Sequence, residues 1–151
     1  MNERLSISAA RNIFYGGTIF FAVIFIGLVI HSVNYATDPE TSNAEDINEQ
    51  VALGKEVWER HSCINCHSLL GEGAYFAPEL GNVWARRGGE EDAESAADYI
   101  KEWMKSQPTG VEGRRQMPNF DLNEEELDAL VEFFKWTNGI NTQNWPPNEE
   151  G

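Results

Sequence analysis

Residues 61–70 read HSCINCHSLL and contain the only two cysteines of the chain, Cys63 and Cys66, followed directly by His67. Two cysteines separated by two residues can form a disulfide, supply half of a zinc site, or attach a haem covalently when a histidine follows. Each possibility predicts a different domain and a different function. The residues around this stretch distinguish between them.

An uncharged apolar segment, residues 13–36, lies near the N-terminus. As a helix that rises about 1.5 Å per residue it is long enough to cross a bilayer. It lacks the polar face that a soluble helix keeps on its exposed side. The apolar run is longer than the core of a secretory signal, about 7–15 residues, and no clear cleavage site follows. The segment is therefore predicted to be a retained transmembrane anchor.

The charges on either side of the anchor predict its orientation. Arg4 and Arg11 precede it, whereas acidic residues follow it. Basic flanks remain on the cytoplasmic side, so the N-terminus is expected in the cytoplasm and the remainder outside. In a bacterium this makes the chain a single-pass protein of the inner membrane, with its main domain in the periplasm.

The main domain is strongly acidic. Residues 1–36 carry a net charge of +1 and the remainder −15, which together give the −14 of the whole chain. Such a charge repels nucleic acid, so a nucleic-acid-binding function is set aside. It would attract a basic soluble protein, although solubility alone also accounts for it.

The organisation follows from these segments and from three helical patterns. We expect a cytoplasmic tail, an anchor, a linker, a periplasmic domain and a C-terminal tail at residues 1–12, 13–36, 37–47, 48–140 and 141–151. Helices are predicted within 48–61, 96–108 and 123–139, the last with a capping box formed by Asn123 and Glu126. No segment shows convincing strand alternation. The domain is therefore expected to be all-α.

Long loops rich in glycine and proline separate these helices and leave a thin hydrophobic core. A large apolar cofactor would supply the missing packing. A thiol redox pair usually precedes a helix in a βαβ unit, which this chain lacks, and a zinc site needs four ligands. Only His61 and His67 would join the two cysteines, all within seven residues. Covalent attachment of one haem c to Cys63 and Cys66, with His67 as axial ligand, is therefore predicted.

A second axial ligand is expected to be a methionine. Met1 lies on the wrong side of the membrane, and Met104 shares a helical stripe with Ile100 and Trp103, which indicates core packing. Met117 lies in a loop that Pro118 stiffens. We predict that Met117 binds the iron, the alternative being that it only fills space in the core. His61 is poorly placed for the opposite face of the haem.

The order of these features resembles a class I cytochrome c domain. It comprises a helix, the Cys-x-x-Cys-His stretch, a loop with proline, a methionine loop and a final helix. The segment APELGN is similar to the Pro-x-Leu segment of that family. The resemblance implies that the Pro78 carbonyl accepts the ring N–H of His67 and that Leu80 packs on the porphyrin.

A closer resemblance covers nearly the whole chain. The stretches ARNIFYGG, GKEVWE, CINCHSLLGEGAYFAPELGNV, GRRQMPNF and NWPPN resemble the cytochrome c subunit of bacterial nitric oxide reductase. The resemblance implies electron transfer from a soluble periplasmic cytochrome c or cupredoxin to a large polytopic catalytic subunit. That partner holds haem and non-haem iron and converts NO to N2O. The chain itself has no evident nucleophile–base pair and is expected to be non-catalytic.

The same resemblance implies a calcium ion shared with the catalytic subunit. The matching segment is GEGAY, which makes the carbonyl of Gly73 and the side chain of Tyr75 candidate ligands. Two oxygens are too few for calcium, so the partner would supply the others, and both residues can equally well only shape a turn. Four arginines can neutralise haem propionates or pair with a partner: Arg86, Arg87, Arg114 and Arg115.

Two other functions remain compatible with the sequence. The first is an independent membrane-tethered cytochrome c, or the cytochrome c subunit of a related haem–copper oxidase. The second is a haem-free, membrane-anchored thiol or zinc protein.

Overall fold

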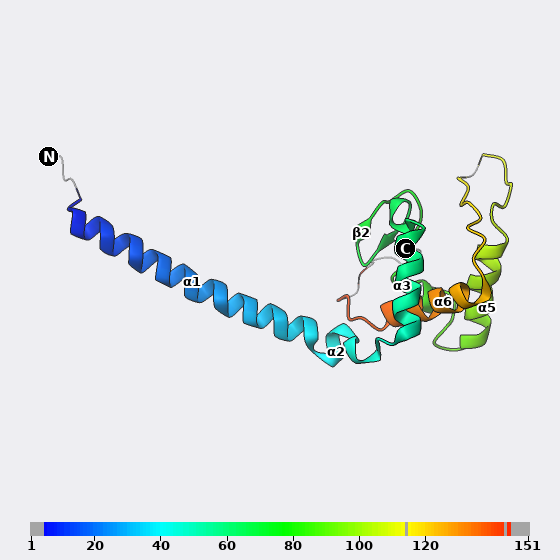
Figure 1. Cartoon of the computed structure of the whole chain (residues 1–151), viewed down its shortest axis with the longest axis horizontal. Helices are drawn as coiled ribbons and strands as arrows, with labels where there is room; N and C mark the ends of the chain where they lie inside the picture. Colours follow the sequence, from blue (N-terminus) through cyan, green and yellow to red (C-terminus); the bar gives the residue numbers. More distant parts are fainter. Residues whose placement is uncertain (1–4, 114, 144, 146–151) are drawn as a thin grey trace. The chain divides into compact units, whose positions relative to one another are not determined.

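The computed structural model describes residues 5–113, 115–143 and 145. Two units are distinguished, the first ending at Asp38 and the second beginning at Pro39. The first unit consists of α1 (Ile7–Thr37), drawn in blue in Figure 1. The second contains the segments that hold the cysteines and the predicted methionine ligand.

Helix α1 is longer than the predicted anchor, because it begins at Ile7 and ends at Thr37. The Ser6 side chain accepts a hydrogen bond from the Ala9 amide at 3.2 Å and so caps the first turn. The helix is long and apolar enough to cross a membrane, and it buries none of its residues inside the structure. An apolar helix without a protein partner is what a lipid-facing anchor requires.

Two short helices occupy the predicted linker, α2 (Pro39–Ser42) and η1 (Ala44–Asp46). Asn43, between them, donates from its side chain to the Trp136 carbonyl at 3.1 Å. The Trp136 indole N–H in turn donates to the Asn43 carbonyl at 2.8 Å. This reciprocal pair attaches the linker to the end of the last helix of the domain.

Three helices form at the predicted positions: α3 (Glu49–Arg60), α5 (Ala93–Lys105) and α6 (Glu124–Asn138). The capping box of Asn123 and Glu126 is confirmed, with the Glu126 amide 3.0 Å from Asn123 Oδ1 and the Asn123 amide 3.0 Å from Glu126 Oε2. Asn48 caps α3 by accepting from the amides of Gln50 and Val51. The all-α prediction is therefore confirmed.

Four short elements between these helices were not predicted: η2 (Cys63–Asn65), β1 (Ser68–Leu69), β2 (Glu72–Gly73) and α4 (Val83–Arg86). The two strands pair antiparallel, with Ser68 opposite Gly73 and Leu69 opposite Glu72. Strands of two residues are too short to show alternation in the sequence.

Helices α3 and α6 make the most extensive contact between elements of the domain. They lie next to each other in Figure 1. Gly54 makes this approach possible. A Cβ atom there would lie 2.0 Å from the Ala129 carbonyl oxygen and 2.6 Å from Phe133 Cβ. Around this crossing the buried apolar side chains of both helices form the core, among them Val51, Val57, Trp58, Leu127, Leu130, Val131 and Phe134.

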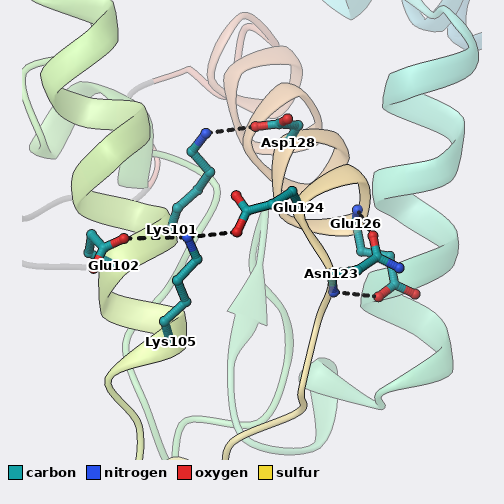
Figure 2. A network of polar contacts seen from close by, with 7 residues as sticks. All are labelled: Lys101, Glu102, Lys105, Asn123, Glu124, Glu126 and Asp128. Atoms are coloured by element: carbon teal, nitrogen blue, oxygen red, sulfur yellow. Dashed lines mark hydrogen bonds and ion pairs between the residues drawn. The ribbon is translucent and has the colours of Figure 1, made fainter.

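Helix α5 packs on α6 through Ala96, Ile100 and Met104, all buried. Figure 2 shows ion pairs beside this contact. Lys101 lies 2.8 Å from Asp128, and Lys105 lies 2.8 Å from Glu124. Such exposed pairs contribute little to stability, so the apolar contact holds the helices together.

The stripe formed by Ile100, Trp103 and Met104 is only partly covered by protein. Met104 is buried in the core, as predicted, whereas Trp103 is 42% exposed. A stripe at helical spacing is wider than the contact that α6 offers, so its edge residue remains in solvent.

The Gly54 crossing predicts a position-specific loss of stability. Gly54→Val should lower the free energy of unfolding by about 1–3 kcal/mol, because the new side chain collides with the backbone of α6. Ala52→Val adds a similar side chain on the exposed side of the same helix and should change the stability little. Denaturant unfolding of the full-length chain in detergent measures both. Equal effects of the two variants would contradict the close contact at Gly54.

Candidate functional site

The cysteine stretch follows α3 almost directly. Ser62, with φ +54°, turns the chain out of the helix, and η2 begins at Cys63. The amides of Cys66 and His67 both donate to the Cys63 carbonyl, at 3.1 and 2.9 Å. In such a tight turn, side chains three residues apart lie one above the other. The turn thus places the two cysteine side chains on one side of the chain and leads directly into His67.

Both cysteines are free thiols, with Cys63 half-buried against the core and Cys66 exposed. Burial is the main cause that raises the pKa of Cys63 to about 11, so this thiol stays protonated at neutral pH. Disulfide exchange uses the thiolate, so the Cys63 thiol is a weak nucleophile at neutral pH. Two free thiols on one side of a turn can each form a thioether bond to the same haem.

His67 is oriented by the loop that follows the hairpin. Its Nδ1–H donates to the Pro78 carbonyl oxygen at 2.8 Å. Burial, the largest influence, lowers the pKa of the imidazole, so the ring is neutral at pH 7. Because Nδ1 carries the proton, the lone pair of Nε2 is available to a metal ion.

Several apolar side chains outside the long helices are partly buried against the hydrophobic core: Cys63, Leu69, Leu80, Met117 and Phe120. Leu80 is held in place because its amide donates to the Ser68 carbonyl at 2.9 Å. His61 packs edge-on against the Phe120 ring, with 5.1 Å between ring centroids. Two thiols, a neutral imidazole, a thioether and an apolar wall together fit a covalently bound haem.

The calcium candidates lie in the hairpin and just after it. Gly73, in β2, has φ +119°, and a Cβ there would lie 2.4 Å from the His67 carbonyl oxygen, so the fold itself requires glycine. Tyr75 is 71% exposed, and its hydroxyl donates to the Gly71 carbonyl at 3.2 Å. Calcium binding through this phenol would replace that hydrogen bond, and the assignment remains a prediction.

The arginines make contacts within the chain. Arg86 donates to the Glu79 carbonyl and to Asn82 Oδ1. Arg87 lies over the ring of Tyr99, and Arg115 over the ring of Phe76, whose carbonyl it also contacts. Arg114 lies outside the described residues. A role for these side chains toward haem propionates remains a prediction.

Sequence reasoning missed Glu79, which lies between Pro78 and Leu80. Its side chain is buried, 4% exposed, and accepts hydrogen bonds from three backbone amides. Acidic residues are rarely buried without a partner, and the sequence gives no pattern that predicts this burial. The only available signal was the position of Glu79 inside the segment APELGN.

Comparisons with known proteins agree with this geometry. A family model for cytochrome c matches residues 51–138. The chain is 55% identical to the C subunit of nitric oxide reductase from Paracoccus denitrificans, over the full length of both chains. Proteins of the same name from Cereibacter sphaeroides and Stutzerimonas stutzeri are 54% and 53% identical, again over both full lengths.

The chain belongs to the family of nitric oxide reductase C subunits.

Membership confirms the resemblance inferred from the sequence, and the cytochrome c domain implies haem c. It also confirms the predicted architecture of one long apolar N-terminal helix followed by a cytochrome c domain. Helix α1 and the relatives together support membrane anchoring. A haem-free thiol or zinc protein is not compatible with this family.

Replacing the cysteines tests the attachment. The native chain should show the pyridine haemochrome spectrum of a c-type haem and retain its haem on denaturing electrophoresis. Cys63→Ser with Cys66→Ser should lose the covalently bound haem, because no thiol remains to form a thioether. His61→Ala is the matched control and should retain it. Covalent haem in the double variant would contradict the assignment of the two cysteines.

Proposed function

We propose that this chain is the electron-receiving subunit of a nitric oxide reductase and carries a single haem c. The hydrogen bond of 2.8 Å between His67 Nδ1 and the Pro78 carbonyl carries this proposal, because it leaves Nε2 free for iron in the residue that directly follows Cys66. The haem supplies one-electron redox chemistry, and the chain's residues hold and orient it.

Met117 is proposed as the second axial ligand. It is half-buried against the core, in the loop between α5 and α6, whereas Met104 is buried within α5. Iron with both histidine and methionine bound has no open position for substrate. The chain by itself is then non-catalytic, and the reduction 2 NO + 2 e⁻ + 2 H⁺ → N2O + H2O takes place on the catalytic subunit.

Substitution of Met117 tests the ligand. Met117→Ala should remove the weak sulfur-to-iron charge-transfer band at the red end of the visible spectrum and lower the midpoint potential. Met104→Leu keeps the core filled and should leave both unchanged. Optical spectra and redox titration of the haem-loaded chain measure the effect. A native spectrum in Met117→Ala would transfer the role to Met104 or His61.

The electron donor is proposed to be a soluble periplasmic cytochrome c or a cupredoxin with a basic surface. The net charge of −15 on residues 37–151 favours such a partner and predicts association that weakens with salt. Exposed apolar side chains occur at Ile64, Tyr75 and Phe76, in the same loop region as the exposed Cys66. Because the calcium candidates Gly73 and Tyr75 lie in the same region, we propose it as the contact surface of the catalytic subunit rather than of the donor.

The recipient of the electrons is proposed to be a large polytopic subunit with haem and non-haem iron. Calcium held jointly by this subunit, the Gly73 carbonyl and Tyr75 would join the two proteins, with the partner supplying most of the oxygens. Because Arg4 and Arg11 precede the apolar segment 13–36, we propose that the N-terminus lies in the cytoplasm and the haem domain in the periplasm of a bacterial inner membrane.

Purification distinguishes this function from that of an independent tethered cytochrome or an oxidase subunit. The tagged chain, extracted from its native membrane in mild detergent, should bring with it a polytopic subunit with haem and non-haem iron, and the complex should reduce NO. Purification of the tagged chain alone would favour an independent electron shuttle. Association with a copper-containing oxidase would favour the other alternative.

A further inference from the structure

A buried carboxylate lies in the loop that orients the histidine. Glu79 Oε1 accepts from the amides of Leu70 at 2.7 Å and Gly81 at 2.8 Å, and Oε2 accepts from the Gly71 amide at 3.3 Å. The side chain therefore connects its own loop with the turn between β1 and β2. Burying a carboxylate is costly unless it is well hydrogen-bonded, so this arrangement has a specific structural role.

The turn that Glu79 contacts is strained, and its backbone amides bind the Glu79 carboxylate. Leu70 and Gly71 both have positive φ, +53° and +85°. Positive φ is unfavourable for leucine, so the turn needs outside support. Successive backbone amides in such a conformation point to one side and form a concavity for a negative charge. Glu79 supplies that charge and so stabilises the turn.

The same segment holds the acceptor of the His67 hydrogen bond. Pro78 precedes Glu79 directly, and Leu80 follows it with its amide bonded to the Ser68 carbonyl. Ser68 in turn follows His67. The residues 67–71 and 78–81 are thus joined by bonds to the histidine ring, the backbone and the carboxylate. The carboxylate makes two of these bonds, with the amides of Leu70 and Gly71, so its loss would loosen the Pro78 carbonyl.

A positive charge lies close to this carboxylate. The Arg86 guanidinium donates to the backbone carbonyl of Glu79 and, at 2.8 Å, to Asn82 Oδ1. Glu79 directly follows Pro78, whose carbonyl accepts from His67 Nδ1, so both charged groups are attached to the segment that orients the ring. The electrostatic field at the ligand ring therefore includes both groups.

From these contacts we propose that Glu79 is a positioning residue for the haem-ligand histidine: it fixes the Pro78 carbonyl at Nδ1 and places a buried negative charge beside the ligand loop. The inference rests on the proposed function, since it takes His67 as an iron ligand. A firm bond at Nδ1 makes Nε2 a stronger donor, and the negative charge stabilises oxidised iron. Both effects lower the midpoint potential.

The test replaces Glu79 with glutamine in the haem-loaded full chain in detergent. Glutamine retains one acceptor oxygen but directs an NH2 group at a backbone N–H, and it removes the charge. We expect a higher midpoint potential and faster solvent exchange of the His67 Nδ1 proton in NMR spectra of the reduced chain. The exchange should rise about 2- to 10-fold, the range that corresponds to one lost hydrogen bond.

Glu72→Gln is the matched control, because it removes one exposed charge from the same hairpin. Its potential should change less than that of Glu79→Gln, and its proton exchange should stay native. If Glu79→Gln does not accumulate, Glu79→Asp keeps the charge with a shorter reach. In that variant exchange should become faster with little change in potential.

Proton exchange at the native rate in Glu79→Gln would overturn the proposal. If Glu79→Asp has to replace that variant, native exchange in Glu79→Asp would overturn it. Equal midpoint potentials of Glu79→Gln and Glu72→Gln would also overturn it. Failure of the proposed function is distinct from these outcomes. In that case the native chain itself would lack a c-type spectrum with histidine bound to iron, and the role of Glu79 would fall with it.

Discussion

The close contact between α3 and α6 at Gly54 fixes the end of α3, from which the cysteines proposed to bind haem follow. Only His61 and Ser62 separate the end of α3 from Cys63, so any shift of α3 on α6 would move the cysteine turn. The glycine lets the two backbones approach, and the buried side chains around it fix the crossing. The contact between α3 and α6 therefore both forms the core and fixes the position of the cysteine turn.

The remaining parts of the site come from loops held by hydrogen bonds. His67 depends on the carbonyl of Pro78, and the loop of Pro78 depends on the carboxylate of Glu79. Leu80 and Met117 lie only partly buried against the core. Half-buried apolar side chains gain more contact when a large apolar group packs on them. This explains how a domain with long loops and few helices forms a stable structure once haem is attached.

Much of this architecture could be predicted from local sequence patterns. The capping box of Asn123 and Glu126, the apolar stripe of α3 and the anchor each depend on residues close in sequence. The Cys-x-x-Cys-His stretch is likewise local, and its chemistry follows from the residue types. The role of Gly54 as the point of closest approach became clear only from the packing of the two helices.

What could not be predicted depends on contacts between distant segments. Glutamate is normally a surface residue, and the burial of Glu79 is explained by the three backbone amides that donate to its carboxylate. Trp103 lies on an apolar stripe, but α6 covers only part of it. Helix α4 and the two strands are too short to leave a periodic pattern. In each case the tertiary environment overrides the local preference.

Rapid mixing of the intact complex with a small amount of reduced basic donor tests the central claim most directly. Following the haems separately by their absorbance, we expect the haem c of this chain to be reduced first. It should then be reoxidised at the rate at which the haems of the catalytic subunit become reduced, and the first phase should slow as salt increases. Reduction of the catalytic haems ahead of the haem c, or independently of it, would contradict the account.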